Sequence, residues 1–276
     1  MVTNQITNVL TEKIISKIKA NEKFKVLILM PLMPGNDGSL KDGSGNFVRK
    51  IMAYQYYTIN KAEKSIIKQI MKYTSHPEKY IKFIGLRTHD IMRNGIPDTS
   101  QVYIHTKAMI VDDEVLILGS ANINDRSMTG VRDSELAVVI SDRDMVDSKF
   151  DGENVELPRI SHELRKKCFM ESFGMEADEV LDPMDDCMWD EIENRVKTNT
   201  ECYRKIFGCY PDNLIKTTPM IDEIEGEGQI TIYDELKDKI KGFAVELPLD
   251  FLGDEDIKSM YYFESKSALL PTSTFL

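Results

Sequence analysis

The sequence predicts an α/β fold in which a mixed sheet is flanked by helices. Apolar side chains recur at helical spacing over residues 4–20, a pattern typical of an amphipathic helix. Short runs rich in Val, Ile and Leu at residues 24–30 and 80–86 are typical of buried strands. At 276 residues, the chain is long enough for one large or two modest domains with a proper core.

The amino-terminal segments are expected to follow the order helix, strand, loop. We interpret the helix at residues 4–20 as packing on the sheet, with a membrane anchor as the alternative. Residues 24–30 form the first strand. Residues 34–45, PGNDGSLKDGSG, are rich in glycine but lack the GxxxxGK[ST] order of a nucleotide-phosphate cradle. They are therefore expected to form a flexible loop at the surface or at the mouth of a site.

The next segments are a helical region and a second strand. Residues 47–73 are expected to be helical, in two pieces broken near Thr58. The lysines of this region are interpreted as a solvated face, with contact to lipid headgroups as the alternative: Lys61, Lys64, Lys68 and Lys72. His89 follows the strand at residues 80–86 and begins a polar loop, so it is a minor candidate for lining the site.

Beyond residue 140 the sequence predicts mainly helices. Residues 141–152 form a polar run without an assigned element. Helices are expected at residues 158–173 and 182–207, and His162 is interpreted as a surface or capping residue of the first of them. Two short strands are expected further on, at residues 229–233 and 243–247.

Composition and charge restrict the class of protein. The formal net charge of −11 argues weakly against nucleic-acid binding, because affinity for a phosphate backbone comes from clustered Lys and Arg. No segment approaches the ~18 to 20 consecutive apolar residues of a membrane helix, and the amino terminus lacks the apolar region of a signal peptide. The four cysteines show no CxxC pairing and are interpreted as reduced thiols. We expect a cytoplasmic protein, with peripheral membrane contact if its substrate is a lipid, and no metal or other cofactor.

The most informative stretch is a predicted hairpin. Residues 102–111 are expected to form a strand whose period of two places His105 and Lys107 on one face. The polar residues 112–114 form a tight turn into a second strand, residues 115–118. Gly119 and Ser120 end that strand.

The side chains near the hairpin suit chemistry at a phosphodiester. A phosphodiester repels nucleophiles, so a site must hold its oxygens with cations or dipoles, here Lys107, Ser120 and Asn122. The His105 imidazole can attack phosphorus or donate a proton to the leaving oxygen. Glu135 is the candidate for a hydrogen bond that orients the His105 ring.

Together these residues resemble a known family. His105, Lys107 and Asp112 have the HxKxxxxD spacing of the phospholipase D superfamily. The extended run IHTKAMIVDDEVLILGSANINDRSM, followed by RDSE, is similar to the second of two motif copies in eukaryotic phosphatidylcholine-hydrolysing phospholipase D. Further segments resemble the same family: residues 26–35, 80–87, 242–252 and 271–272.

The resemblance carries implications for fold and chemistry. It implies one lobe of a two-lobed phospholipase D, with a catalytic half-domain at residues 1–145 and a helical and stranded extension at residues 146–276 packed on the same lobe. It also implies a phosphohistidine intermediate, no metal in the chemical step, and phosphatidate as product. We expect Asp112, in the hairpin turn, to stabilise the motif rather than to contact phosphorus.

The chain departs from the family in having one motif. Of its four histidines, His105 alone has a lysine two residues on. In-line displacement needs an attacking group on one side of phosphorus and a proton donor on the other, so one imidazole cannot serve both. A second protomer or a separate chain must supply the other motif. Because the chain begins close to where the second half of the family's pattern begins, a fragment or split gene product is expected.

The sequence therefore predicts a phospholipase D half. It would hydrolyse, or transphosphatidylate, phosphatidylcholine-type lipids at a membrane surface once the other half is present. One alternative is a catalytically silent half that acts in lipid binding or regulation. The other is a single-motif phosphodiesterase or nuclease that dimerises, against which the acidic composition and the lipid-type flanking motifs count.

Overall fold

The computed structural model describes residues 3–41, 43–224 and 230–255. The main sheet is mixed, as predicted, and runs in the order β1-β2-β3 with β9 also paired to β2. β1 (Val26–Leu29) lies parallel to the first half of β2 (Ile81–Ile91). β3 (Pro97–Gln101) and β9 (Ala244–Glu246) pair with β2 in the antiparallel sense. A strand from the carboxyl-terminal part thus completes the sheet.

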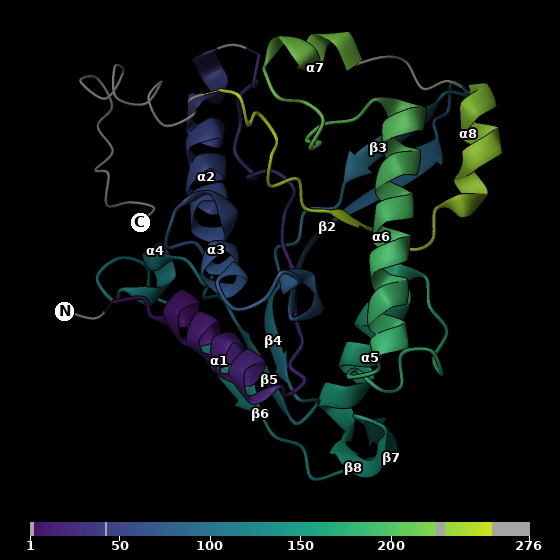
Figure 1. The fold of residues 1–276 in the computed structure, drawn as a ribbon. Coiled ribbons are helices and arrows are strands. Elements are labelled where there is room, and N and C mark those ends of the chain that lie inside the picture. The colour runs from purple at the N-terminus through teal and green to yellow at the C-terminus, as the bar shows by residue number, and fades with distance from the viewer. Residues whose placement is uncertain (1–2, 42, 225–229, 256–276) are drawn as a thin grey trace.

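A second, antiparallel sheet carries the predicted hairpin. β4 (Lys107–Val111) pairs with β5 (Val115–Gly119), which pairs with β6 (Ala137–Ile140). A separate two-stranded ribbon follows, formed by β7 (Met145–Phe150) and β8 (Glu153–Pro158). Figure 1 shows this second sheet and the ribbon at one end of the molecule.

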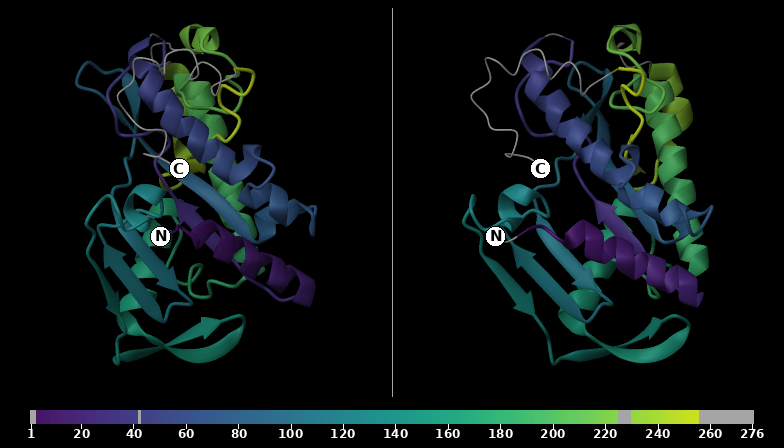
Figure 2. Two further views of the ribbon diagram at one scale, coloured as in Figure 1. Left: turned by 90° about the vertical axis from the view of Figure 1, so that its left-hand side faces the viewer. Right: turned by 60° about the vertical axis from the view of Figure 1, so that its left-hand side comes forward.

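Helices cover the main sheet on both sides, which confirms the predicted fold class. α2 (Asn46–Tyr56) and α3 (Ile66–Met71) lie on one side of β1 and β2, and α6 (Asp186–Phe207) lies on the other (Figures 1 and 2). α1 (Ile6–Ala20) begins the chain and packs against α3. Other helices of the described residues are α4 (Asp125–Met128), α5 (Arg159–Phe173), α7 (Pro219–Ile224) and α8 (Ile230–Leu236).

The largest hydrophobic cluster joins these layers. Ile14 of α1, Ile70 of α3, Ile81 of β2 and Tyr203 of α6 are all buried in it. Burial of such side chains contributes about 1.5–3 kcal/mol each. The amino-terminal cap of α6 is Asp185, whose side chain accepts a hydrogen bond from the Cys187 backbone N–H at 3.0 Å. The cluster holds β2 in place, and the chain continues from β2 through β3 to the β4–β5 hairpin.

Several elements differ from the sequence prediction. The polar run at residues 141–152 forms the β7–β8 ribbon, turning at Asp151 and Gly152, which both have positive φ. Residues 230–233 lie in helix α8 and not in a strand, and residue 229 lies outside the described part. His89 lies within β2, which continues into a β2–β3 hairpin. The resemblance at residues 271–272 also falls outside the described residues.

Candidate active site

The β4–β5 hairpin places the motif at one end of the second sheet. Its turn has positive φ at Asp112 and Asp113, 52° and 57°, a conformation that Asp tolerates better than bulkier residues. Lys107 pairs with Gly119, and Gly119 pairs with Ala137, so the three strands meet at this end. Gly119 is required there, because an added Cβ would lie 2.6 Å from the Leu136 carbonyl oxygen.

His105 and Lys107 lie together at this end. His105 precedes β4, so the regular strand is shorter than the predicted residues 102–111, and its side chain is exposed. The Lys107 ammonium donates a hydrogen bond to the His105 carbonyl oxygen at 2.6 Å. The Tyr103 ring stacks beside the His105 ring, with centroids 6.2 Å apart. Tyr103 also contacts Gly35, so the glycine-rich loop reaches the neighbourhood of the imidazole.

Glu135 does not make the expected contact with His105. Its carboxylate accepts hydrogen bonds from the Ser120 hydroxyl at 2.5 Å and from the Ser127 hydroxyl at 2.6 Å. These two bonds, together with the more distant charge of Lys107, lower the pKa of Glu135. The carboxylate is instead directed to Ser120, which directly follows β5, and to Ser127 of α4, with one hydrogen bond on each oxygen. We refer to Ser120, Ser127 and Glu135 as the Glu135 cluster.

Of the two other expected donors, the Ser120 hydroxyl is already bonded and the Asn122 side chain is exposed. The Ser120 hydroxyl is directed to Glu135, and its oxygen accepts from the Leu136 backbone N–H at 3.0 Å, so it does not point as a donor into open space. The backbone N–H of Asn122 donates to Ser127 at 3.1 Å, and the Asn122 residue is exposed. The Asn122 side chain therefore remains available to an oxyanion, whereas the Ser120 hydroxyl serves the Glu135 cluster.

The stabilising role expected of Asp112 falls to its neighbour. Asp112 is exposed, whereas Asp113 is 3% exposed. Asp113 accepts a hydrogen bond from Arg165 at 2.6 Å and lies 2.9 Å from the Nδ1 atom of His162. The His162 Nε2 atom lies 3.2 Å from the Ser148 hydroxyl. His162, predicted at the surface, is thus buried in a network that ties the hairpin turn to α5.

Sequence reasoning missed the roles of four residues: Ser127, Asp113, His162 and Arg165. Ser127 stands inside the recognised motif, but its partner Glu135 is eight residues away across a loop. His162 and Arg165 are three residues apart on one helix, the spacing of neighbours on a helix face, which was an available signal.

Comparisons with known proteins show the family of the chain. A family model described as Phospholipase D matches residues 1–237. The chain belongs to the phospholipase D family. It is 35% identical to human Phospholipase D1 over 268 residues, and 37% identical to Phospholipase D of Phytophthora infestans over 227 residues. It is also 34% identical to Phospholipase D zeta 1 of Arabidopsis thaliana over 293 aligned positions.

The matches cover most of this chain and a small part of each relative. They include 93%, 82% and 94% of this chain, but 25%, 13% and 27% of the human, Phytophthora and Arabidopsis proteins. The mixed α/β architecture is consistent with one lobe of the phospholipase D fold. Within the described ranges, no helix is both long and apolar enough to span a bilayer, and no group of three acidic, His or Cys side chains could hold a metal.

Proposed function

We propose that this phospholipase D family member carries one of the two motifs of a phospholipid-hydrolysing site and works with a second motif from another protomer or chain. The observation that carries the proposal is the meeting of His105, Lys107 and the Glu135 cluster at one end of the β4–β6 sheet. An imidazole and an ammonium that share an exposed sheet edge suit the chemistry of a phosphodiester.

In the proposed reaction the two motifs act on opposite sides of phosphorus. One imidazole attacks phosphorus, the bond to the headgroup oxygen breaks, and the other imidazole gives that oxygen a proton. Water, or an added alcohol, then attacks the phosphohistidine at phosphorus; the P–N bond breaks, and the second imidazole takes up the proton of the attacking hydroxyl. His105 takes one of these two tasks. Lys107 and the Asn122 amide stabilise the phosphoryl oxygens. The Glu135 carboxylate, held by the Ser120 and Ser127 hydroxyls, keeps the segment that follows β5 in position near Lys107.

An apolar sheet face next to His105 suits the docking of the second half. Met109 and Val111 lie on the same face of β4 as Lys107, and Val139 lies on the same face two strands away. Their side chains are 46%, 42% and 68% exposed. Burying a contiguous apolar face is favourable at about 25 cal/mol per Å². We infer that the other half covers this face and brings its own imidazole toward His105, and that the assembly acts at a membrane surface.

The proposal is tested with phosphatidylcholine vesicles in the presence of ethanol. Formation of phosphatidylethanol by the purified chain, alone or with a candidate partner, supports it. His105→Ala should abolish the product. His76→Ala is the matched control, because His76 is an exposed histidine beside Glu78 on another loop, and this variant should keep full activity. Turnover that persists in His105→Ala would remove this site from the reaction.

A catalytically silent half is the second candidate, and the single motif favours it. It predicts a folded chain that binds phosphatidylcholine vesicles and yields no phosphatidylethanol under any assembly state. Cleavage of DNA without phosphatidylethanol formation would instead indicate the dimeric nuclease, against which the net charge of −11 counts.

A further inference from the structure

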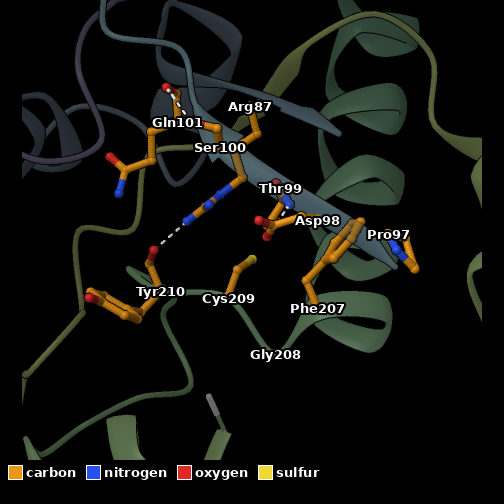
Figure 3. A pocket seen from close by; sticks show the side chains of 10 residues that line it. All are labelled: Arg87, Pro97, Asp98, Thr99, Ser100, Gln101, Phe207, Gly208, Cys209 and Tyr210. Carbon is orange, nitrogen blue, oxygen red and sulfur yellow. Dashed lines mark hydrogen bonds between the residues drawn. The ribbon is translucent and has the colours of Figure 1, made fainter. Parts of the chain in front are cut away.

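A polar pocket lies between the β2–β3 hairpin and the carboxyl-terminal end of α6 (Figure 3). Its volume is about 450 Å³, within the range of small-ligand sites. It is lined by Arg87 of β2, by residues 97–101 of β3 and by residues 207–210. None of these residues belongs to the candidate active site, so the pocket needs its own explanation.

Arg87 is a buried cation that lines this pocket. It is 4% exposed, and one guanidinium nitrogen, Nη2, donates to the Tyr210 carbonyl oxygen at 2.5 Å. Figure 3 shows the side chain extending from β2 toward that carbonyl. Among the described residues, no carboxylate lies within ion-pairing distance of it. A guanidinium has five N–H donors, so a buried one with a single neutral acceptor retains unused donors and an uncompensated charge.

The surroundings hold Arg87 in place and add a second donor. The Arg87 backbone N–H donates to the Phe243 carbonyl at 2.8 Å, and the Tyr203 hydroxyl donates to the Arg87 carbonyl at 3.2 Å. Gln101 is the cross-strand partner of Arg87, so both side chains project from the same face of the hairpin. The one acidic residue of the lining, Asp98, is exposed and accepts from the Thr99 backbone N–H at 2.7 Å.

We propose that this pocket is a second anion site, which binds a carboxylate or phosphate group through Arg87 with the Gln101 amide as an additional donor. The planar fork of arginine matches two oxygens of such a group and gives charge-assisted bonds that are about twice as strong as neutral ones. The volume leaves room for an organic portion beyond the anionic group. The ligand is therefore a small organic acid, a phosphate monoester or an anionic lipid headgroup. The inference does not depend on the proposed function.

The test uses inorganic phosphate as the probe, in a Lys107→Gln chain that weakens phosphate binding at the candidate active site. Calorimetric titration should give saturable binding, and phosphate should raise the melting temperature. Gln101→Glu, added to this chain, places a carboxylate opposite Arg87 at a partly exposed position and should weaken binding roughly tenfold or more. Asp98→Asn should strengthen binding, because it removes the negative charge at the rim.

Two further measurements complete the test. Arg87→Lys keeps the charge but not the fork, so this variant, if circular dichroism shows that it folds, should bind phosphate more weakly than its parent. Co-sedimentation with phosphatidylcholine vesicles, with and without phosphatidate, distinguishes a lipid headgroup from a soluble anion. A lipid headgroup is indicated if phosphatidate increases the fraction of chain bound to vesicles and Gln101→Glu lowers that increase. The proposal is overturned if the Lys107→Gln chain does not bind phosphate, or if Gln101→Glu binds it as tightly as its parent.

Discussion

Replacement of Asp113 by Asn is expected to destabilise the protein strongly. Asp113, His162 and Arg165 are 3%, 1% and 5% exposed, so the carboxylate and the guanidinium interact almost without solvent. The carboxylate accepts from the Arg165 Nη2 at 2.6 Å and from its Nε at 3.1 Å. An Asn side chain removes the negative charge and leaves the Arg165 cation buried. Breaking such a pair costs roughly 3–5 kcal/mol, and the residual carbonyl acceptor of Asn favours the lower end.

The assay is urea-induced unfolding followed by circular dichroism. Asp112→Asn is the matched control, because Asp112 is the adjacent turn residue, has the same positive φ and is exposed. Asn tolerates that conformation, so the control should change the free energy of unfolding by less than about 0.5 kcal/mol. The reasoning is refuted if Asp113→Asn costs less than about 1 kcal/mol, or if the two variants are equally destabilised.

Three further predictions follow from individual contacts. Burial lowers the pKa of His89. The unfolded histidine therefore takes up a proton before the folded one, and the free energy of unfolding should fall as the pH drops below about 6.5. His89→Gln should flatten this pH dependence in urea titrations at pH 5 to 7. Ser127→Ala removes one of the two hydroxyl bonds to Glu135 and should raise the pKa of that carboxyl. Carbon-13 NMR measures the titration, and an unchanged pKa would mean that the Ser127 bond does not form. Asp185→Ala removes the amino-terminal cap of α6 and should cost about 0.5–2 kcal/mol, whereas Asp190→Ala, at an exposed position within the same helix, should cost little.

Sequence patterns predicted the parts of the fold that depend on local periodicity. The helices at residues 4–20, 158–173 and 182–207 were expected within a few residues of α1, α5 and α6. The hairpin around Asp112 was expected because a polar interruption separates two β-rich runs. Each of these signals lies within a single window of sequence, where hydrophobic spacing and turn residues act directly on the backbone.

The remaining features depend on contacts between distant segments. Residues 230–233, ITIY, have strand propensity but form a helix, because Tyr233 packs against Phe207 and lies 3.1 Å from His89. His162 is buried because Asp113, 49 residues earlier, reaches it. The serine partners of Glu135 could not be assigned, because Ser120 is 15 residues away along the chain and only the fold brings the two side chains together. The motif residues were found, but their hydrogen-bond partners were not.

The central claim is that the single His105–Lys107 motif becomes a complete site only in an assembly. The direct test measures the rate of phosphatidylethanol formation per chain over a wide range of chain concentrations, with sedimentation run in parallel to give the oligomeric state. The account predicts no turnover by monomer, and turnover that appears together with a dimer or with an added partner chain. A monomer that turns over at a concentration-independent rate per chain would contradict it.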